Sequence, residues 1–324
     1  MSGGNTAGAW HWFGRPGPAR GRRSLEVVRR PTTVELMLLT TIVLWALNLT
    51  ASRYVLTHGF QPLAYSTLRY ATAAAIFLVL TAALERTVRV GRVDVRLVLG
   101  AAALLFVNQI GFVYALDRTT ASTVGLILGA TPIFAALIAV ALGLDRLSRR
   151  FWLATIVSFA GVGLVAAGAG GELSGDFLGI VMSILTAATW AGYSIAVTPL
   201  QERYSPYRVS ALVLGLTTLA LAVAGSSQTA TQELSLGWDV WSLFAFAVLG
   251  PLVITTVLWF RTLDRIGAAR ATLAANLHPF VAALFAVILL SESMTLVQVA
   301  GGVLIAVGIA LARVRRRPVA PGAE

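Results

Sequence analysis

The chain has 324 residues, of which 57% are hydrophobic and 12% charged, and its mean hydropathy is +0.80. A soluble domain carries about a quarter charged residues, so this composition predicts a polytopic membrane protein. The absence of cysteine excludes disulfides, thiolate metal sites and a cysteine nucleophile. The net charge of +11 comes from arginines at the ends of apolar segments, which indicates membrane topology and not nucleic-acid binding.

Ten segments are apolar enough to cross a bilayer, for which a helix needs about 20 residues. They cover residues 33–56, 63–83, 96–116, 120–142, 150–168, 176–198, 207–225, 239–260, 268–290 and 296–313. Residues 1–31 are rich in Gly, Pro and Arg, so we expect a disordered, basic cytoplasmic tail there. Residues 314–324 form a second basic tail, also expected in the cytoplasm.

The arginines are concentrated in every second connection between the predicted spans. The two tails and the second, fourth, sixth and eighth connections hold 22 of the 25 basic residues, all of which are arginine. The fifth and seventh connections hold acidic residues and no arginine. The positive-inside rule therefore predicts a multi-pass protein of the cytoplasmic (inner) membrane with both termini in the cytoplasm.

The sequence repeats itself at a spacing of 147 residues. The matched positions include Leu116-Asp117-Arg118 with Leu263-Asp264-Arg265, Pro132 with Pro279, Ala135-Ala136-Leu137 with Ala282-Ala283-Leu284, Asp145 with Glu292, and Gly161 with Gly308. Each copy holds five spans, an odd number, so the second copy must enter the membrane from the opposite face. We therefore expect an all-α fold of ten transmembrane helices, in two inverted five-helix repeats (residues 32–170 and 171–313) around a central cavity. Such repeats are typical of secondary transporters, whose substrate site lies between the halves.

Polar side chains in the first two spans are candidates for the wall of that cavity, because polar groups are costly in hydrocarbon. Trp45 and Asn48 share one helical face, and Asn48 can both donate and accept hydrogen bonds. The alternative for Asn48 is a hydrogen bond between helices. Arg69, six residues into the second span, could bind a substrate carboxylate bidentately or pair structurally with Asp117.

The third and sixth spans add further candidates. Adjacent residues diverge by about 100° on a helix, so we expect Gln109 and not Asn108 to face the cavity. Tyr114 lies one to two turns further along the same span. Trp190 and Tyr193 form an aromatic face in the sixth span, for which the alternative is simple helix packing.

The fourth and ninth spans are the best matched pair and carry two predicted hinges. Pro132 and Pro279 each remove a backbone hydrogen bond, and paired interruptions in the two halves indicate a transporter's binding site or hinge. Asn276 and His278 precede the second proline, and His278 is either a substrate ligand or a neutral packing residue. Asp145 and Glu292, which follow the two spans, either pair with neighbouring helix ends as gates or are solvated caps. Gly125-x-x-x-Gly129 permits close helix packing in the fourth span.

The chain resembles the EamA-type branch of the drug/metabolite transporter superfamily over about residues 33–313. The resemblance rests on the ten-span inverted repeat together with Leu44-Trp45-Ala46-Leu47-Asn48, Leu68-Arg69-Tyr70, and Thr131-Pro132 followed by Asp145. Ala46 stands where the family typically has glycine. The resemblance implies a basket of helices around a central cavity, alternating access, and export of amino acids or related metabolites.

These observations favour a secondary transporter that exports small organic metabolites such as amino acids by alternating access. A transporter of sugar-like or cationic compounds is the alternative, and an intramembrane lipid-modifying enzyme would need an acidic or histidine cluster that the sequence does not offer. We expect no enzymatic activity, no metal or other cofactor and no nucleic-acid partner. The expected partners are the small-molecule substrate and the lipid bilayer, and the fold permits a monomer or a homodimer.

Overall fold

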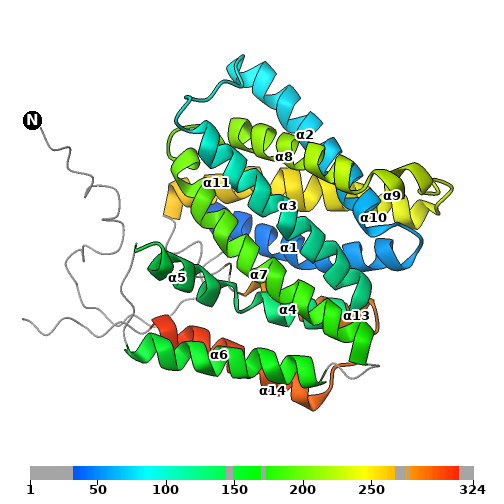
Figure 1. The fold of residues 1–324 in the computed structure, drawn as a ribbon, viewed down its shortest axis with the longest axis vertical. Helices are drawn as coiled ribbons and strands as arrows, with labels where there is room; N and C mark the ends of the chain where they lie inside the picture. Colours follow the sequence, from blue (N-terminus) through cyan, green and yellow to red (C-terminus); the bar gives the residue numbers. More distant parts are fainter. Residues whose placement is uncertain (1–31, 144–148, 169–172, 267–274, 276, 314–324) are drawn as a thin grey trace, which may run out of the picture. The chain divides into compact units, whose positions relative to one another are not determined.

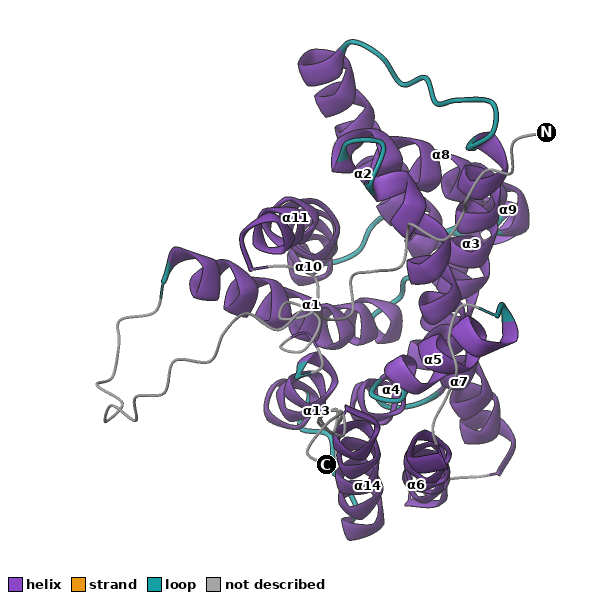
Figure 2. Ribbon diagram, turned by 90° about the vertical axis from the view of Figure 1, so that its left-hand side faces the viewer, coloured by secondary structure: helices purple, strands orange, loops and turns teal. Residues whose placement is uncertain are grey.

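The computed structural model describes residues 32–143, 149–168, 173–266, 275 and 277–313, and the described part is helical throughout, without strands (Figures 1 and 2). The first half contains α1 (Thr33–Thr57), α2 (Pro62–Glu85), α3 (Val95–Arg118), α4 (Ala121–Leu128), α5 (Thr131–Ala141) and α6 (Arg149–Gly168). The second half contains α7 (Leu173–Gln201), α8 (Pro206–Ala224), α9 (Ser226–Thr231), α10 (Trp238–Val248), the π-helical turn η2 (Leu249–Ile254), α11 (Thr255–Ile266), α13 (His278–Leu289) and α14 (Leu296–Arg313).

The all-helical membrane fold predicted from the sequence is confirmed. Among the described residues, seven helices are long and apolar enough to cross a bilayer, or eight when α4 and α5 are counted as one bent span. Two shorter apolar helices, α13 and the greater part of α14, lie in the ninth and tenth predicted spans. The first half of the ninth predicted span falls outside the described residues, so the count of ten spans stays a prediction.

The fourth predicted span is broken at Gly129 and Ala130, and its two halves are bent by 40°. Pro132 lies in the first turn of α5 and has no N–H to donate to the carbonyl of Leu128. The Thr131 hydroxyl takes that place and donates to the same carbonyl oxygen at 2.6 Å. The carbonyl of Leu128 therefore keeps a hydrogen-bond partner although its backbone bond is missing.

Equivalent helices of the two halves pack against each other in pairs. α6 lies beside α14, α4 beside α13 and α2 beside α8, while α3 packs on α7 and α1 packs on α10 and α11 (Figures 1 and 2). A rotation that exchanges the two halves maps each of the pairs α6–α14, α4–α13 and α2–α8 onto itself. The same rotation maps the contact of α3 with α7 onto the contact of α1 with α10 and α11. The pairing is thus that of a pseudo-two-fold axis between the repeats.

The direction of the repeats can be followed in the contact between α6 and α14. A Cβ placed on Gly161 would lie 2.6 Å from the carbonyl oxygen of Gly301, and a Cβ on Gly308 would lie 2.8 Å from that of Ala154. Gly308 is the counterpart of Gly161 and Gly301 that of Ala154, so the two contacts are images of each other. Contacts of 161 with 301 and of 154 with 308 run antiparallel, as an inverted repeat requires.

The connections at the two ends of the bundle also pair between the halves. At the α2–α3 end, Asp94 accepts hydrogen bonds from Arg203 and Tyr204, and Glu85 pairs with Arg208. At the α1–α2 end the contacts involve glutamines and single carboxylates: Gln232 accepts from the amide of Gln61 at 2.7 Å, Gln228 accepts from the amide of Leu63 at 2.7 Å, and Asp239 accepts the hydroxyl of Tyr54 at 2.6 Å. The described arginine–carboxylate pairs between the halves thus lie at the α2–α3 end, while the carboxylates at the α1–α2 end accept from neutral groups.

Candidate functional site

Arg69 is buried between three helices about 10 Å from the start of α2, at 2% exposure. Its NH1 group donates to Asn48 Oδ1 at 3.1 Å, to the Tyr65 hydroxyl at 3.3 Å and to Ser52 Oγ at 3.4 Å. Its NH2 group donates to Gln109 Oε1 of α3 at 2.9 Å. The side chains of Asn48 and Gln109, predicted to line one cavity with Arg69, therefore meet at its guanidinium.

The positive charge of Arg69 has no carboxylate partner among the described residues. The rings of Tyr65, Tyr70 and Phe112 lie over the guanidinium at 5.0, 5.5 and 5.3 Å from their centroids, and its Nε atom is buried without a hydrogen-bond partner. The alternative pairing with Asp117 is not formed, because that carboxylate lies 3.4 Å from Nε of its neighbour Arg118. A buried charge is costly unless it is paired, so this arrangement suits an anionic ligand.

A chain of amides connects Arg69 to the second half of the molecule. Gln109 Nε2 donates to Asn108 Oδ1 at 3.1 Å, and Asn108 Nδ2 donates to the carbonyl of Thr186 in α7 at 2.9 Å. The two adjacent amides of α3 thus point in different directions, as the helix geometry predicts. Gln109 faces the guanidinium, while Asn108 fixes the position of α3 against α7.

Trp45 belongs to a second cluster, one turn of α1 away from Asn48. Its indole N–H donates to the Thr255 hydroxyl at 3.0 Å, and its ring lies 5.2 Å from that of Trp259 and 6.2 Å from that of His278, centroid to centroid. The cluster joins α1 of the first half to α11 and α13 of the second. Nε2 of His278 is buried and has no hydrogen-bond partner. An aromatic surface with one unpaired polar atom therefore adjoins the cationic cluster.

The remaining predicted site residues do not join these two clusters. Trp190 is 41% exposed and packs on Tyr193 at 5.3 Å between ring centroids. The hydroxyl of Tyr114 accepts a hydrogen bond from Gln228 at 3.1 Å, which ties α3 to α9. Asn276 lies outside the described residues. Roles for these residues in substrate binding stay predictions.

Residues that the sequence analysis did not select also contribute to the clusters, among them Tyr65 and Thr255. Tyr65 precedes Arg69 by four positions in α2, a spacing that places both side chains on one helical face and is readable in the sequence. Thr255 follows the π-helical turn η2, and its contact with Trp45 depends on the rotation of α11 relative to α1. No local pattern in the sequence specifies that rotation.

Glu292 caps the end of a neighbouring helix in the other repeat, and its role as a gate stays a prediction. Its Oε1 accepts the backbone N–H of Ala121 at 2.8 Å, and its Oε2 accepts that of Ser122 at 2.9 Å. Both amides belong to the first turn of α4, where unpaired N–H groups and the helix dipole favour an anion. Its counterpart Asp145 lies outside the described residues.

Apolar helices in two copies related by an inverted pseudo-two-fold are the architecture of a membrane transporter, and here they enclose a buried polar cluster held by α1, α2 and α3. The chain belongs to the EamA-like transporter family, whose model matches residues 32–167 and again residues 177–314. These ranges correspond to the two halves described above. The resemblance suggested by the sequence is therefore confirmed.

Several relatives carry the same general description. Two proteins of Archaeoglobus fulgidus, each named an uncharacterized transporter, are 26% identical over 227 residues (69% of this chain, 78% of the relative) and 25% identical over 291 residues (87% and 99%). The uncharacterized transporter YyaM of Bacillus subtilis is 23% identical over 290 residues (85% and 92%). A solved crystal structure shares the fold with a TM-score of 0.59 at 19% identity, covering 87% of this chain and 96% of the other.

Proposed function

We propose that this transporter exports small organic metabolites that carry a carboxylate, amino acids among them, across the cytoplasmic membrane by alternating access. The carboxylate binds the guanidinium of Arg69, and the apolar part of the substrate packs against Trp45, Trp259 and His278. The excess of arginine in the termini and the even connections supports cytoplasmic termini and the inner membrane. The transporter works without enzymatic chemistry.

The unpaired charge of Arg69 is the observation that carries this proposal. Neutral oxygens and aromatic faces surround the guanidinium, and they hold its orientation without cancelling its charge. A planar guanidinium presents parallel N–H donors that match a carboxylate, so a substrate carboxylate would supply the missing counter-charge. The same positive charge would repel a cationic substrate, which argues against that alternative at this site.

The closure of the site supports alternating access. Arg69 is 2% exposed, so a substrate reaches it only when helices part. The break between α4 and α5, the start of α13 at Pro279 and the π-helical turn η2 are places where such bending costs little, because the regular helical bonding is already interrupted there. The two halves would then rock about the site, opening one end at a time.

Counterflow in proteoliposomes tests the proposal. Vesicles preloaded with a pool of amino acids would be offered labelled aromatic, aliphatic and sulfur amino acids, with wild-type protein, Arg69→Gln, Arg69→Lys and Arg118→Gln. Arg118 is an exposed arginine whose replacement makes the same change of charge outside the site. We expect wild type and Arg118→Gln to accumulate label and Arg69→Gln to lose it, since losing one partner of a buried charge pair costs about 2–5 kcal/mol.

Arg69→Lys separates charge from geometry in the same experiment. Lysine keeps the positive charge but lacks the planar fork, so we expect binding to be weakened and not abolished. All variants would be compared at equal amounts of monodisperse, reconstituted protein. Equal accumulation by Arg69→Gln and wild type would contradict the proposed carboxylate site, and no accumulation of any amino acid by folded wild-type protein would contradict this substrate class.

A further inference from the structure

The connection between α2 and α3, residues 86–94, carries a basic surface that the proposed transport mechanism does not use (Figure 1). Four exposed arginines lie along this connection and in the first turn of α3, and we call them the arginine surface: Arg86, Arg89, Arg92 and Arg96. None of the four side chains forms an ion pair with another described residue. Their positive charges are therefore available to a ligand.

The carboxylates beside the arginine surface do not cancel its charge. Asp94 is paired with Arg203 and Glu85 with Arg208, both arginines of the second half. Glu202, at the end of α7, is exposed and forms no ion pair with a described residue. In the two connections and the helix turns beside them, six arginines face three carboxylates, a net charge of +3. This excess favours an anionic partner.

Exposed apolar side chains alternate with these arginines along the chain. Val88, Val93 and Val95 are all exposed, and Val93 is exposed to 82%. They continue the exposed apolar surface of the two spanning helices, where Leu84 of α2 and Leu99 of α3 are 62% and 52% exposed. The exposed leucines of a membrane span face lipid, so the arginines lie where hydrocarbon gives way to headgroups. A basic segment with an apolar side is typical of the membrane interface.

We propose that the arginine surface binds the headgroups of anionic phospholipids in the leaflet at the α2–α3 end. The phosphates contact Arg89, Arg92 and Arg96, because a guanidinium binds a phosphate bidentately. The valines lie at the level of the ester groups and the upper acyl chains. A nucleic acid or an acidic protein would match the arginines but would leave the valines in water, so the alternation of both favours lipid.

The lipid would bind without disturbing the contacts between the two halves. The arginines of the surface are exposed, whereas Asp94 is 5% exposed and is already bonded to the α7–α8 connection by Arg203 and Tyr204. One short connection would thus hold the second half through its carboxylate and the membrane through its arginines.

Native mass spectrometry of the purified full chain tests this assignment, with phosphatidylglycerol and phosphatidylcholine of identical acyl chains as probes. The double variant Arg89→Gln, Arg92→Gln removes two charges of the arginine surface. Its matched control is the double variant Arg22→Gln, Arg23→Gln, which makes the same change of net charge in the N-terminal tail. Only monodisperse protein would be compared.

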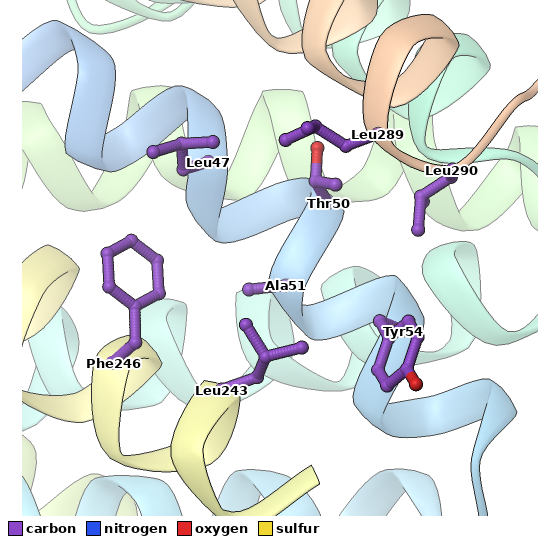
Figure 3. Close-up of a pocket in the computed structure, with 8 residues that line it drawn as sticks. All are labelled: Leu47, Thr50, Ala51, Tyr54, Leu243, Phe246, Leu289 and Leu290. Atoms are coloured by element: carbon purple, nitrogen blue, oxygen red, sulfur yellow. The ribbon is translucent and has the colours of Figure 1, made fainter. Parts of the chain in front are cut away.

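A further control excludes lipid that is retained elsewhere on the molecule. An apolar cavity of about 320 Å³ lies between α1, α10 and the end of α13, and Figure 3 shows Leu47, Leu243 and Leu289 among its walls. An acyl chain held there would be lost in Leu243→Trp, which narrows the cavity and leaves the arginine surface unchanged.

We expect wild type to retain phosphatidylglycerol in preference to phosphatidylcholine. The Arg89, Arg92 double variant should bind phosphatidylglycerol about 25-fold more weakly, since each basic residue at an anionic lipid surface is worth about 1 kcal/mol, a factor of about five. The tail variant and Leu243→Trp should keep the preference of wild type. Equal retention of both lipids by wild type, a fall of equal size in the tail variant, or a loss of phosphatidylglycerol in Leu243→Trp alone would overturn the assignment.

Discussion

Glu292 follows α13, and its two carboxylate oxygens accept the first backbone N–H groups of α4 from the other repeat. In Glu292→Gln the side chain keeps one acceptor oxygen and loses the negative charge that favours a helix N-terminus. We expect the free energy of unfolding to fall by about 0.5–2 kcal/mol, the usual cost of losing an N-terminal cap. Thermal unfolding in detergent would measure this. Glu202→Gln, at an exposed carboxylate, is the control, and an equal fall in both variants would contradict the capping role.

At the residue scale, the sequence predicted polar candidates better than it predicted their partners. The sequence predicted four candidates because polar side chains are costly in hydrocarbon: Trp45, Asn48, Arg69 and Gln109. In the structure, Arg69 donates hydrogen bonds to Asn48 and to Gln109. Partners such as Thr255 depend on how one helix is rotated against another. Helix periodicity defines which residues share a face but not which helix that face meets.

At the element scale, hydropathy located the spans because each must cover a membrane of fixed thickness. The interruptions were predictable only where a proline matched its counterpart, as at Pro132, where the structure shows a 40° break. The π-helical turn at Leu249–Ile254 was not predicted, although it contains Pro251. Its one extra residue leaves the hydrophobic pattern of the span unchanged, so composition gives no signal for it.

The closest approach of equivalent helices depends on glycine. Gly161→Leu would drive a side chain into the backbone of α14, where a Cβ alone would lie 2.6 Å from the Gly301 carbonyl oxygen. We expect a loss of about 1–3 kcal/mol of stability from this overpacking, measured as a lower unfolding temperature of the purified protein. Gly163→Leu is the matched control, since nothing lies within 4 Å of a Cβ there. A similar loss in both variants would show that helix propensity, not the contact with α14, decides the outcome.

At the scale of the whole molecule, the two ends of the bundle are closed by chemically different contacts. The α2–α3 end has two carboxylates, Asp94 and Glu85, each paired with an arginine of the α7–α8 connection or the start of α8. The described contacts of the α1–α2 end use the amides of Gln228 and Gln232 together with the carboxylates of Asp239 and Glu292, which accept from neutral groups. An inverted repeat places equivalent connections at opposite ends, so we expect this difference in chemistry to give the two conformations of the proposed alternating-access cycle unequal stability.

Asp94→Asn would weaken the α2–α3 end alone. The pair with Arg203 is partly exposed, so we assign its loss about 1 kcal/mol, which would raise the population open at this end about fivefold. The absence of native cysteine allows single reporters: Ala101→Cys, fully buried near the start of α3, and Ala64→Cys, fully buried near the start of α2. We expect Asp94→Asn to speed maleimide labelling at position 101 and not at position 64.

Asp117→Asn is the matched control for this experiment, because its carboxylate pairs only with the adjacent, exposed Arg118 among the described ion pairs. It should leave both labelling rates unchanged. Faster labelling of both reporters in Asp94→Asn would mean general loosening of the bundle. Selective opening, by contrast, requires that the Asp94 pair be broken in one conformation and kept in the other, since an interaction present equally in both cannot shift their populations.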